Sequence, residues 1–357
     1  MTRERDNIAA MDGYVSGEQP DNIPGLIKLN TNENPYPPAP EINNVIKAFD
    51  TEKLRRYPPA NANEFRDLAA ELHAVNRGNI IATRGGDELL RLMITTFVNP
   101  GEIIGVTDPT YSLYSVLARI QNCPVLQVPL GADWTPPEEF AKNMNDAGVK
   151  LTFLGNPHAP SGVLLDQEVI SRIANDLDGL LLLDEAYIDF VDPARQYRSP
   201  SLLDDFDNVV ILRTLSKGYS LAGLRLGYGI GREQLIRPML EKTRDSYNLD
   251  WLSQEIASTA LRHRTHAAHT WKLVRDERVR ITGIFRSMGL GVGDSEANFL
   301  LVTFPDGNAE NCYEFLRNRG IFVRYFHHKA LEDKLRISIG APHENDRLLG
   351  SIRDFPG

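Results

Sequence analysis

The stretch VVILRTLSKGYSLAGLRLG, residues 209–227, decides the fold class. Its first four residues are apolar and long or β-branched, which predicts a buried strand. Two hydroxyls and a lysine follow directly, Thr214, Ser216 and Lys217, and a glycine-punctuated turn then leads to Arg225. A lysine placed between hydroxyls and an arginine suits a phosphorylated ligand. Taken alone, the stretch fits an ordinary solvated loop equally well, so the rest of the chain must decide.

The composition is that of an ordinary soluble globular protein. Of the 357 residues, 42% are hydrophobic and 24% are charged, and the net charge is −9, which gives no general attraction to nucleic acid or to an anionic membrane. The two cysteines, Cys123 and Cys312, are too few for a disulfide framework and are compatible with a reducing cytosol. The N-terminus, MTRERDNIAAMDGY, lacks the apolar core of a signal peptide. A cytoplasmic protein is therefore expected.

Short apolar runs alternate with helical patterns from about residue 80 onward. A typical helical pattern is DELLRLMITTFV, residues 87–98, which places its apolar residues on one face. This alternation predicts an α/β fold whose mostly parallel, seven-stranded sheet is covered by helices on both faces. Ligands of such sheets bind beyond the carboxyl ends of the strands. The seven predicted strands are 80–82, 103–106, 125–128, 151–154, 180–183, 209–212 and 226–230.

The chain divides into four segments by composition and pattern. Residues 1–40 are rich in Asn, Pro and Gly and predict an extended arm that lies over another surface. Residues 41–250 form the large α/β domain. Residues 251–288 read as one long linking helix with few breakers, and 289–357 as a small α+β domain.

Chemically useful residues follow several predicted strands. Two glycines open a helix after the first strand, where free N–H groups and the helix dipole favour a phosphate, although a plain turn explains them as well. A carboxylate that ends an apolar strand, as Asp184 does, is costly unless it is paired. Each feature is weak alone, but together they suit pyridoxal phosphate, which carries a phosphate, a basic ring nitrogen and an aldehyde. The residues are Gly86, Asp87, Tyr111, Asn156, Asp184, Tyr187 and Lys217.

The ordered motifs resemble those of the fold-type I pyridoxal-phosphate enzymes and, among these, of the histidinol-phosphate aminotransferase branch. The resemblance covers nearly the whole chain. It implies an aminotransferase of histidine biosynthesis that interconverts L-histidinol phosphate plus 2-oxoglutarate and imidazole-acetol phosphate plus L-glutamate. The motifs are YVSGEQ, NTNENP, GGDE, DPTY, NPHAPSG, DEAY, SKGYSLAGLRLG and LRISIG.

The resemblance implies a role for each residue around the cofactor ring. Lys217 would hold the cofactor as a Schiff base and later move the substrate proton, which requires a lysine with a lowered pKa. Asp184 would pair with the pyridine nitrogen. Asn156 and Tyr187 would bond the phenolic oxygen, and Tyr111 would stack on the ring.

The same resemblance assigns the cofactor phosphate to five residues. The backbone of Gly86 and Asp87 would bind it at the start of a helix. Thr214 and Ser216 would add hydroxyls, and Arg225 a guanidinium fork.

Further residues are implied for substrate binding and for subunit assembly. Arg324 and Arg336 would receive the phosphate of one substrate or the carboxylates of the other, although Arg324 could also be a solvated strand-end residue. Tyr14 and Asn32 of the arm would close over the pocket. Tyr57 resembles a tyrosine that this family contributes from the partner subunit, which implies a homodimer with shared sites.

The sequence departs from the family pattern at one turn and leaves other functions open. The Asn-Pro turn holds His158 and Ala159 where the family often has two polar residues, which should change the outer face of the turn and keep the Asn156 contact. No metal is expected, because no carboxylate or cysteine joins the three histidines of 263–269. The alternatives are an aromatic-amino-acid aminotransferase, a threonine-phosphate decarboxylase or a non-catalytic cofactor-binding regulator.

Overall fold

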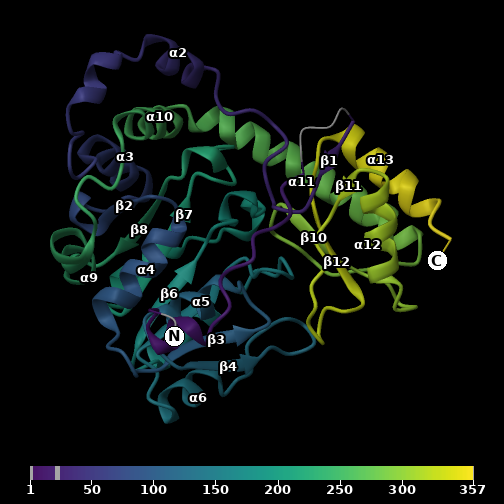
Figure 1. The fold of residues 1–357 in the computed structure, drawn as a ribbon, viewed down its shortest axis with the longest axis horizontal. Helices are drawn as coiled ribbons and strands as arrows, with labels where there is room; N and C mark the ends of the chain where they lie inside the picture. Colours follow the sequence, from purple (N-terminus) through teal and green to yellow (C-terminus); the bar gives the residue numbers. More distant parts are fainter. Residues whose placement is uncertain (1–2, 21–24, 357) are drawn as a thin grey trace.

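The computed structural model describes residues 3–20 and 25–356, and its centre is a seven-stranded sheet (Figure 1). Residues 1–2 and 21–24 of the predicted arm, and residue 357 of the predicted small domain, lie outside the described residues. All seven predicted strands are present, and β8 alone among them runs antiparallel to its neighbours. In spatial order they are β2 (Ile80–Thr83), β8 (Gly227–Gly231), β7 (Val209–Thr214), β6 (Leu180–Asp184), β5 (Leu151–Gly155), β3 (Ile104–Asp108) and β4 (Val125–Pro129).

Helices cover both faces of this sheet, because alternate strand residues point to opposite sides. Val209 and Ile211 of β7 belong to one apolar core, and Val210 and Leu212 to the other. The first core is closed by α3 (Asn63–His73), α6 (Phe140–Asp146), α7 (Gln167–Asp176) and α10 (Trp251–Arg262). The second is closed by α4 (Gly86–Phe97), α5 (Leu113–Ile120) and α9 (Glu233–Pro238). The predicted fold class is confirmed.

The C-terminal part of the chain forms a smaller α+β unit beside the sheet. Its antiparallel sheet has the order β12 (Lys334–Ser338), β10 (Phe299–Thr303), β9 (Gly291–Val292), with helices α12 (Ala309–Asn318) and α13 (Pro342–Arg353) packed against each other. The arm reaches this unit, because β1 (Ile27–Lys28) pairs in parallel with β11 (Ile321–Phe322). The strand expected over 321–326 is thus only two residues long and continues as an isolated bridge between Arg324 and Arg336.

The prediction of a single long helix over 251–288 is wrong in one respect. It consists of α10 and α11 (Arg264–Ser287), which meet at His263, whose φ of −102° and ψ of 33° are not helical. α10 packs on α2 (Glu41–Ala48) and α3, whereas α11 runs along β9, β10 and α13 (Figure 1). No glycine or proline stands at the break, so the sequence pattern does not reveal it.

Two short α-helices remain, α1 (Asp6–Ala9), which packs on α5, and α8 (Leu202–Asp205), and the described chain also has short 3-10 helices and one π-helical turn, Met239–Thr243. Within residues 3–20 and 25–356, no helix is both long and apolar enough to cross a membrane.

Candidate active site

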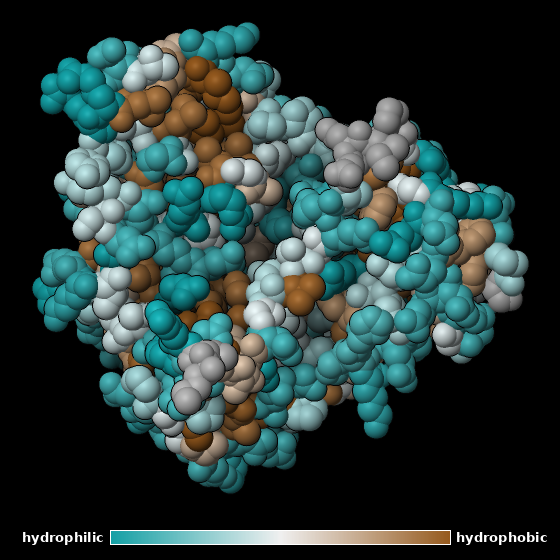
Figure 2. Space-filling model, viewed as in Figure 1, coloured by the Kyte–Doolittle hydropathy of each residue, from teal (hydrophilic) through white to brown (hydrophobic). Residues whose placement is uncertain are grey.

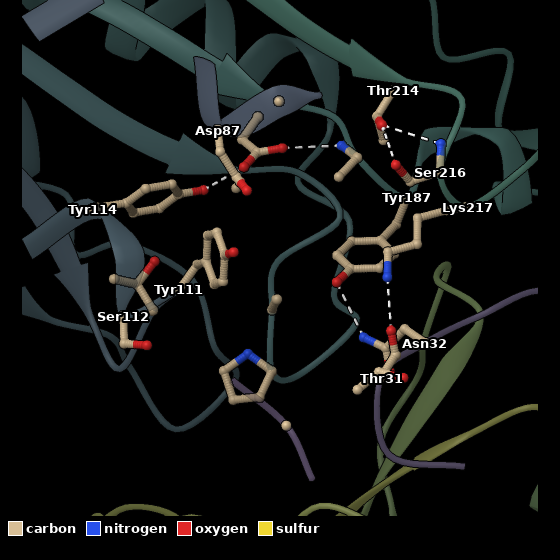
Figure 3. A pocket seen from close by; sticks show the side chains of 18 of the residues that line it. Thr31, Asn32, Asp87, Tyr111, Ser112, Tyr114, Tyr187, Thr214, Ser216 and Lys217 are labelled. Carbon is tan, nitrogen blue, oxygen red and sulfur yellow. Dashed lines mark hydrogen bonds between the residues drawn. The ribbon is translucent and has the colours of Figure 1, made fainter. Parts of the chain in front are cut away.

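A cavity of about 310 Å³ lies where the arm, the carboxyl ends of the central strands and the smaller unit meet (Figure 3). All the predicted site residues line this cavity except Asn156 and Tyr57. Residues far apart in sequence are therefore brought together as expected for the carboxyl edge of a parallel sheet.

Lys217 lies between the sheet edge and the arm. Its Nζ donates a hydrogen bond to the Thr31 carbonyl at 2.7 Å and stands over the Tyr187 ring, 5.9 Å from its centroid (Figure 3). Burial, followed by the positive charge of Arg336, lowers the pKa of Lys217 to about 7. A large fraction of this amine is therefore neutral, and nucleophilic, at neutral pH.

This lowered pKa predicts how the apo-protein captures pyridoxal phosphate. The rate of capture, followed by stopped-flow absorbance, should rise with pH through about 7 and then level off, because only the neutral amine attacks the aldehyde. The folded state releases the Lys217 proton near pH 7, and the unfolded chain keeps it to about 10.5, so the apo-protein should also gain stability as pH rises through that window. A capture rate that still climbs toward pH 10 would contradict the lowered pKa.

Asp184 ends β6 as a buried carboxylate with two partners. Its Oδ1 accepts a hydrogen bond from the Ala186 N–H at 3.0 Å, and its Oδ2 accepts one from the Tyr114 hydroxyl at 2.6 Å. Burial raises the pKa of Asp184 to about 6, and the Tyr114 hydrogen bond opposes that rise. Sequence reasoning missed Tyr114, although it lies three residues after Tyr111 in the same segment.

The start of α4 and the turn after β7 form a cradle of hydrogen-bond donors. Gly85 has φ +77°, and a Cβ there would lie 2.9 Å from Nη2 of Arg225, so glycine leaves room for this guanidinium above the helix start. Nη2 of Arg225 pairs with Oδ2 of Asp87 at 3.3 Å. The Thr214 hydroxyl donates to Oγ of Ser216 at 3.0 Å, and Nη1 of Arg225 donates to the same oxygen at 3.4 Å. Helix-start amides, hydroxyls and a guanidinium fit a phosphate group.

The smaller C-terminal unit contributes two arginines to the cavity wall. Arg324 and Arg336 exchange backbone hydrogen bonds of 3.0 and 2.9 Å, and both guanidinium groups lie 5.3 Å from the Phe326 ring centroid. Arg336 donates through Nη2 to the Asn30 carbonyl at 3.0 Å, but its buried Nε has no hydrogen-bond partner among the described residues. A buried donor without a partner is costly, so this wall favours an anionic ligand.

Asn32 ties the arm to both other parts of the site. Its backbone N–H donates to Oγ of Ser338 at 2.9 Å, and its Nδ2 donates to the Tyr187 hydroxyl at 3.0 Å (Figure 3). Tyr14 also lies at the cavity, with its ring edge-on to Tyr111 at a centroid distance of 5.8 Å. The arm thus covers the cavity with two of the side chains expected there.

The structure does not support the predicted contact of Asn156 with the cofactor. Its Nδ2 donates to the Tyr197 hydroxyl at 3.0 Å and to the Leu165 carbonyl at 3.2 Å, and its Oδ1 accepts from the Leu165 N–H at 2.7 Å. The amide is thus satisfied within the fold and does not line the cavity, whereas Ala159 does. The residues of this turn that line the cavity are Gly155, Pro157, Ala159 and Pro160.

His158 of the same turn is buried and links the turn to the segment that follows β3 through a hydrogen bond to Pro109. Its Nε2 lies 2.9 Å from the Pro109 carbonyl, which can only accept, so Nε2 carries the proton, and Nδ1 accepts from Oγ of Ser161 at 2.8 Å. Burial lowers the pKa of His158 to about 4, which keeps the ring neutral. The departure from the family pattern thus forms an internal support rather than an altered outer face.

Tyr57 does not reach the cavity of its own chain. It is 78% exposed and stacks on Tyr247 at a centroid distance of 4.5 Å. A contribution from Tyr57 to an active site therefore requires a second copy of the chain.

Lys217 and Asp184 thus line one cavity at the edge of a mostly parallel sheet. The family model of the class I and II aminotransferases matches residues 24–352 of this chain. The chain is 41% identical to a histidinol-phosphate aminotransferase of Microcystis aeruginosa, over 100% of this chain and 99% of that protein. It is 40% identical to histidinol-phosphate aminotransferase 1 of a Nostoc species, over 98% and 97%. The chain belongs to the histidinol-phosphate aminotransferase family, which confirms the resemblance seen in its motifs.

Solved structures agree on the fold. The histidinol-phosphate aminotransferase of Sinorhizobium meliloti in complex with pyridoxal-5'-phosphate superposes with a TM-score of 0.90 and 24% identity, covering 99% of this chain and 98% of that one. The L-threonine-O-3-phosphate decarboxylase of Porphyromonas gingivalis superposes with a TM-score of 0.77 and 21% identity, over 92% and 99%. Because enzymes with both names share this fold, fold alone does not distinguish these two activities.

Proposed function

We propose that this protein is a pyridoxal-phosphate-dependent aminotransferase that interconverts L-histidinol phosphate plus 2-oxoglutarate and imidazole-acetol phosphate plus L-glutamate, in histidine biosynthesis. The observation that carries the proposal is one cavity in which Lys217, Asp184 and the pair Arg324 and Arg336 face a common space. The full-length similarity to histidinol-phosphate aminotransferases supports this substrate. Their identities of 40 and 41% favour amino transfer over the decarboxylase and aromatic alternatives.

The cofactor, pyridoxal phosphate, supplies an aldehyde that accepts the amino group and a ring that takes up the electrons released at the substrate carbon. Lys217 would hold the cofactor and carry the proton at Nζ, which its lowered pKa allows at neutral pH. Asp184 would keep the ring nitrogen protonated, and the rings of Tyr111 and Tyr187 border the same cavity. The Tyr187 hydroxyl, which accepts a hydrogen bond from Asn32, would bond the phenolic oxygen of the cofactor.

The cofactor phosphate is assigned to the donor cradle. The backbone of Gly86 and Asp87 at the start of α4 binds it together with Thr214, Ser216 and Arg225. Such an anchor would hold the cofactor in the site independently of its bond to Lys217. The Asp87 carboxylate stays paired with Arg225, which limits its repulsion of the phosphate.

The substrate anions are assigned to the arginine wall. The unpartnered Nε of Arg336 and the neighbouring Arg324 receive the phosphate of histidinol phosphate in one half-reaction and the carboxylates of 2-oxoglutarate in the other. Tyr14 and Asn32 close the site from the arm.

A substrate panel tests the proposed function. The purified holoenzyme is assayed for amino transfer from glutamate to two acceptors, imidazole-acetol phosphate and phenylpyruvate. A separate assay measures carbon dioxide release from threonine phosphate. We expect the highest kcat/KM with imidazole-acetol phosphate. Carbon dioxide release without amino transfer would establish the decarboxylase, and a bound cofactor that turns over no amino donor would establish a regulator.

We also propose four segments for each subunit and a cytoplasmic location. The segments are an arm, a large domain, the linking helices and a small domain, at residues 1–40, 41–250, 251–288 and 289–357. The free cysteines 123 and 312 suit a reducing compartment.

We further propose that the active unit is a homodimer. Apolar side chains gather on the surface over α2 and α10 (Figure 2). Ile46, Leu54 and Tyr57 are exposed by 50%, 63% and 78%. A second copy of this chain would cover them and would receive Tyr57 in its cavity.

Mixed dimers provide a test of the shared site. Lys217→Ala and Tyr57→Ala subunits are each expected to form impaired homodimers, because one lacks the lysine and the other lacks the tyrosine of the neighbouring cavity. Subunits mixed after mild dissociation should regain about a quarter to a half of the wild-type activity per site, because one of the two sites in a heterodimer is then intact. Light scattering gives the oligomeric state. A monomeric active protein, or mixing without any recovery, would refute the shared site.

A further inference from the structure

Tyr114 contacts the carboxylate that is assigned to the ring nitrogen. Tyr114 belongs to α5 and Asp184 ends β6, and both side chains are buried. The hydroxyl-to-Oδ2 distance is 2.6 Å, and the dashed line from Tyr114 in Figure 3 marks this bond. The other carboxylate oxygen is held by the Ala186 N–H. Both oxygens of Asp184 are therefore fixed by the protein.

We propose that Tyr114 is a positioning residue, which holds the Asp184 carboxylate ionised and in one orientation so that it keeps the cofactor ring nitrogen protonated. The inference rests on the role proposed above for Asp184, and it adds a residue to which the sequence motifs assigned no role.

The phenol is held in place by its neighbours. Its ring stacks on Phe153 with a centroid distance of 4.9 Å and an interplanar angle of 19°, and it meets the Tyr111 ring edge-on at 5.5 Å. Burial, followed by the Asp184 carboxylate, raises the pKa of Tyr114 well above its ordinary value, so the hydroxyl remains a donor. A donor with a fixed ring loses little entropy when it binds a carboxylate.

The hydrogen bond acts against the cost of burying a charge. Burial favours the protonated, neutral form of Asp184, and a donated O–H bond favours the ionised form. The other titratable groups that act on Asp184 or on Tyr114 add no positive charge. Asp87 and Glu185 are carboxylates already paired with arginines, and Tyr111 and Tyr187 are phenols. Among the described residues, Tyr114 is therefore the side chain that donates a hydrogen bond to Asp184 and favours its charged form.

Tyr114→Phe tests the proposal, because it removes one oxygen atom and keeps the ring. In the apo-protein, isotope-edited infrared spectroscopy of aspartate carboxyls should show the titration midpoint of Asp184 moving up by about one to two pH units. In the holoenzyme the pH dependence of the cofactor absorbance should shift, and kcat should fall ~10- to 100-fold while KM changes little. Tyr313→Phe, at a ring that stacks on Tyr325 away from the cavity, is the matched control and should change none of these.

A double-mutant cycle separates positioning from general packing. In an Asp184→Asn background, Tyr114→Phe should have little further effect on kcat or on the absorbance, because the hydroxyl acts through the carboxylate. An equal effect in both backgrounds, or an unmoved apo-protein midpoint, would overturn the proposal. A moved apo-protein midpoint with unchanged holoenzyme absorbance and kcat would instead overturn the role assigned to Asp184. The substrate panel judges the proposed function separately, on the wild-type protein.

Discussion

Lys217→Ala is expected to remove the yellow colour of the holoenzyme and to lower kcat by ~10³-fold or more, because one side chain both holds the cofactor and moves the proton. Among the described residues, Lys217 is the only lysine that lines the cavity, and Lys28, whose charge acts on it, is paired with Glu33. The other cationic side chains that line the cavity, Arg225, Arg324 and Arg336, are guanidinium groups, which do not act as nucleophiles. Absorbance spectroscopy and steady-state assays measure the two effects.

Two controls separate lost chemistry from lost structure. Lys53→Ala, which removes an amine paired with Glu255 outside the cavity, should keep both colour and activity. Added methylamine should restore part of the activity of Lys217→Ala, since a small amine fits the space that the side chain leaves. A Lys217→Ala protein that keeps the colour and turns over normally would show that the wrong lysine has been assigned.

The sheet was predictable from the sequence because most of its strands are buried on both faces, the edge strand β4 excepted. Runs such as 209–212 are continuously apolar, which distinguishes them from the polar loops around them. The carboxyl-edge rule then placed residues from separate strands, such as Asp184 and Lys217, in one cavity without knowledge of distances. Topology, rather than any single motif, made this part of the site predictable.

Side-chain direction within a turn was not predictable in the same way. Asn156 and Ala159 lie three residues apart, and only the folded turn shows that Ala159 lines the cavity and that the Asn156 amide bonds Leu165 and Tyr197. His158 looked like an outer-face residue because its partners, Pro109 and Ser161, are recognised only by their positions in space. Local sequence predicts which residues follow a strand, but tertiary hydrogen bonds decide where they point.

A buried ion pair that the sequence motifs do not predict lies next to the site. Nη2 of Arg213, in β7, lies 2.7 Å from Oε2 of Glu185, the residue after Asp184. The Glu185 side chain is fully buried and also accepts hydrogen bonds from the hydroxyls of Tyr197 and Ser199 at 2.8 Å each. This network anchors the ends of β6 and β7, from which Asp184 and the Lys217 turn project.

Arg213→Met should therefore destabilise the apo-protein by about 3–5 kcal/mol, because it leaves the buried carboxylate of Glu185 without its cation. Urea denaturation measures the loss, and the affinity for pyridoxal phosphate should fall with it. Arg195→Met, which breaks an exposed pair with Asp166, is the matched control and should cost no more than about 1 kcal/mol.

The double variant Arg213→Met/Glu185→Met shows whether the unpaired charge causes the loss. If it does, removing both partners should restore most of the stability, since two apolar side chains replace the pair and the Asp189 carboxylate keeps the positive charge of Arg264. Cofactor affinity need not return with it, because the hydroxyls of Tyr197 and Ser199 lose their acceptor and no longer order the end of β6. Stability that stays low in the double variant would mean that the packing of Arg213, not its charge, supports these strand ends.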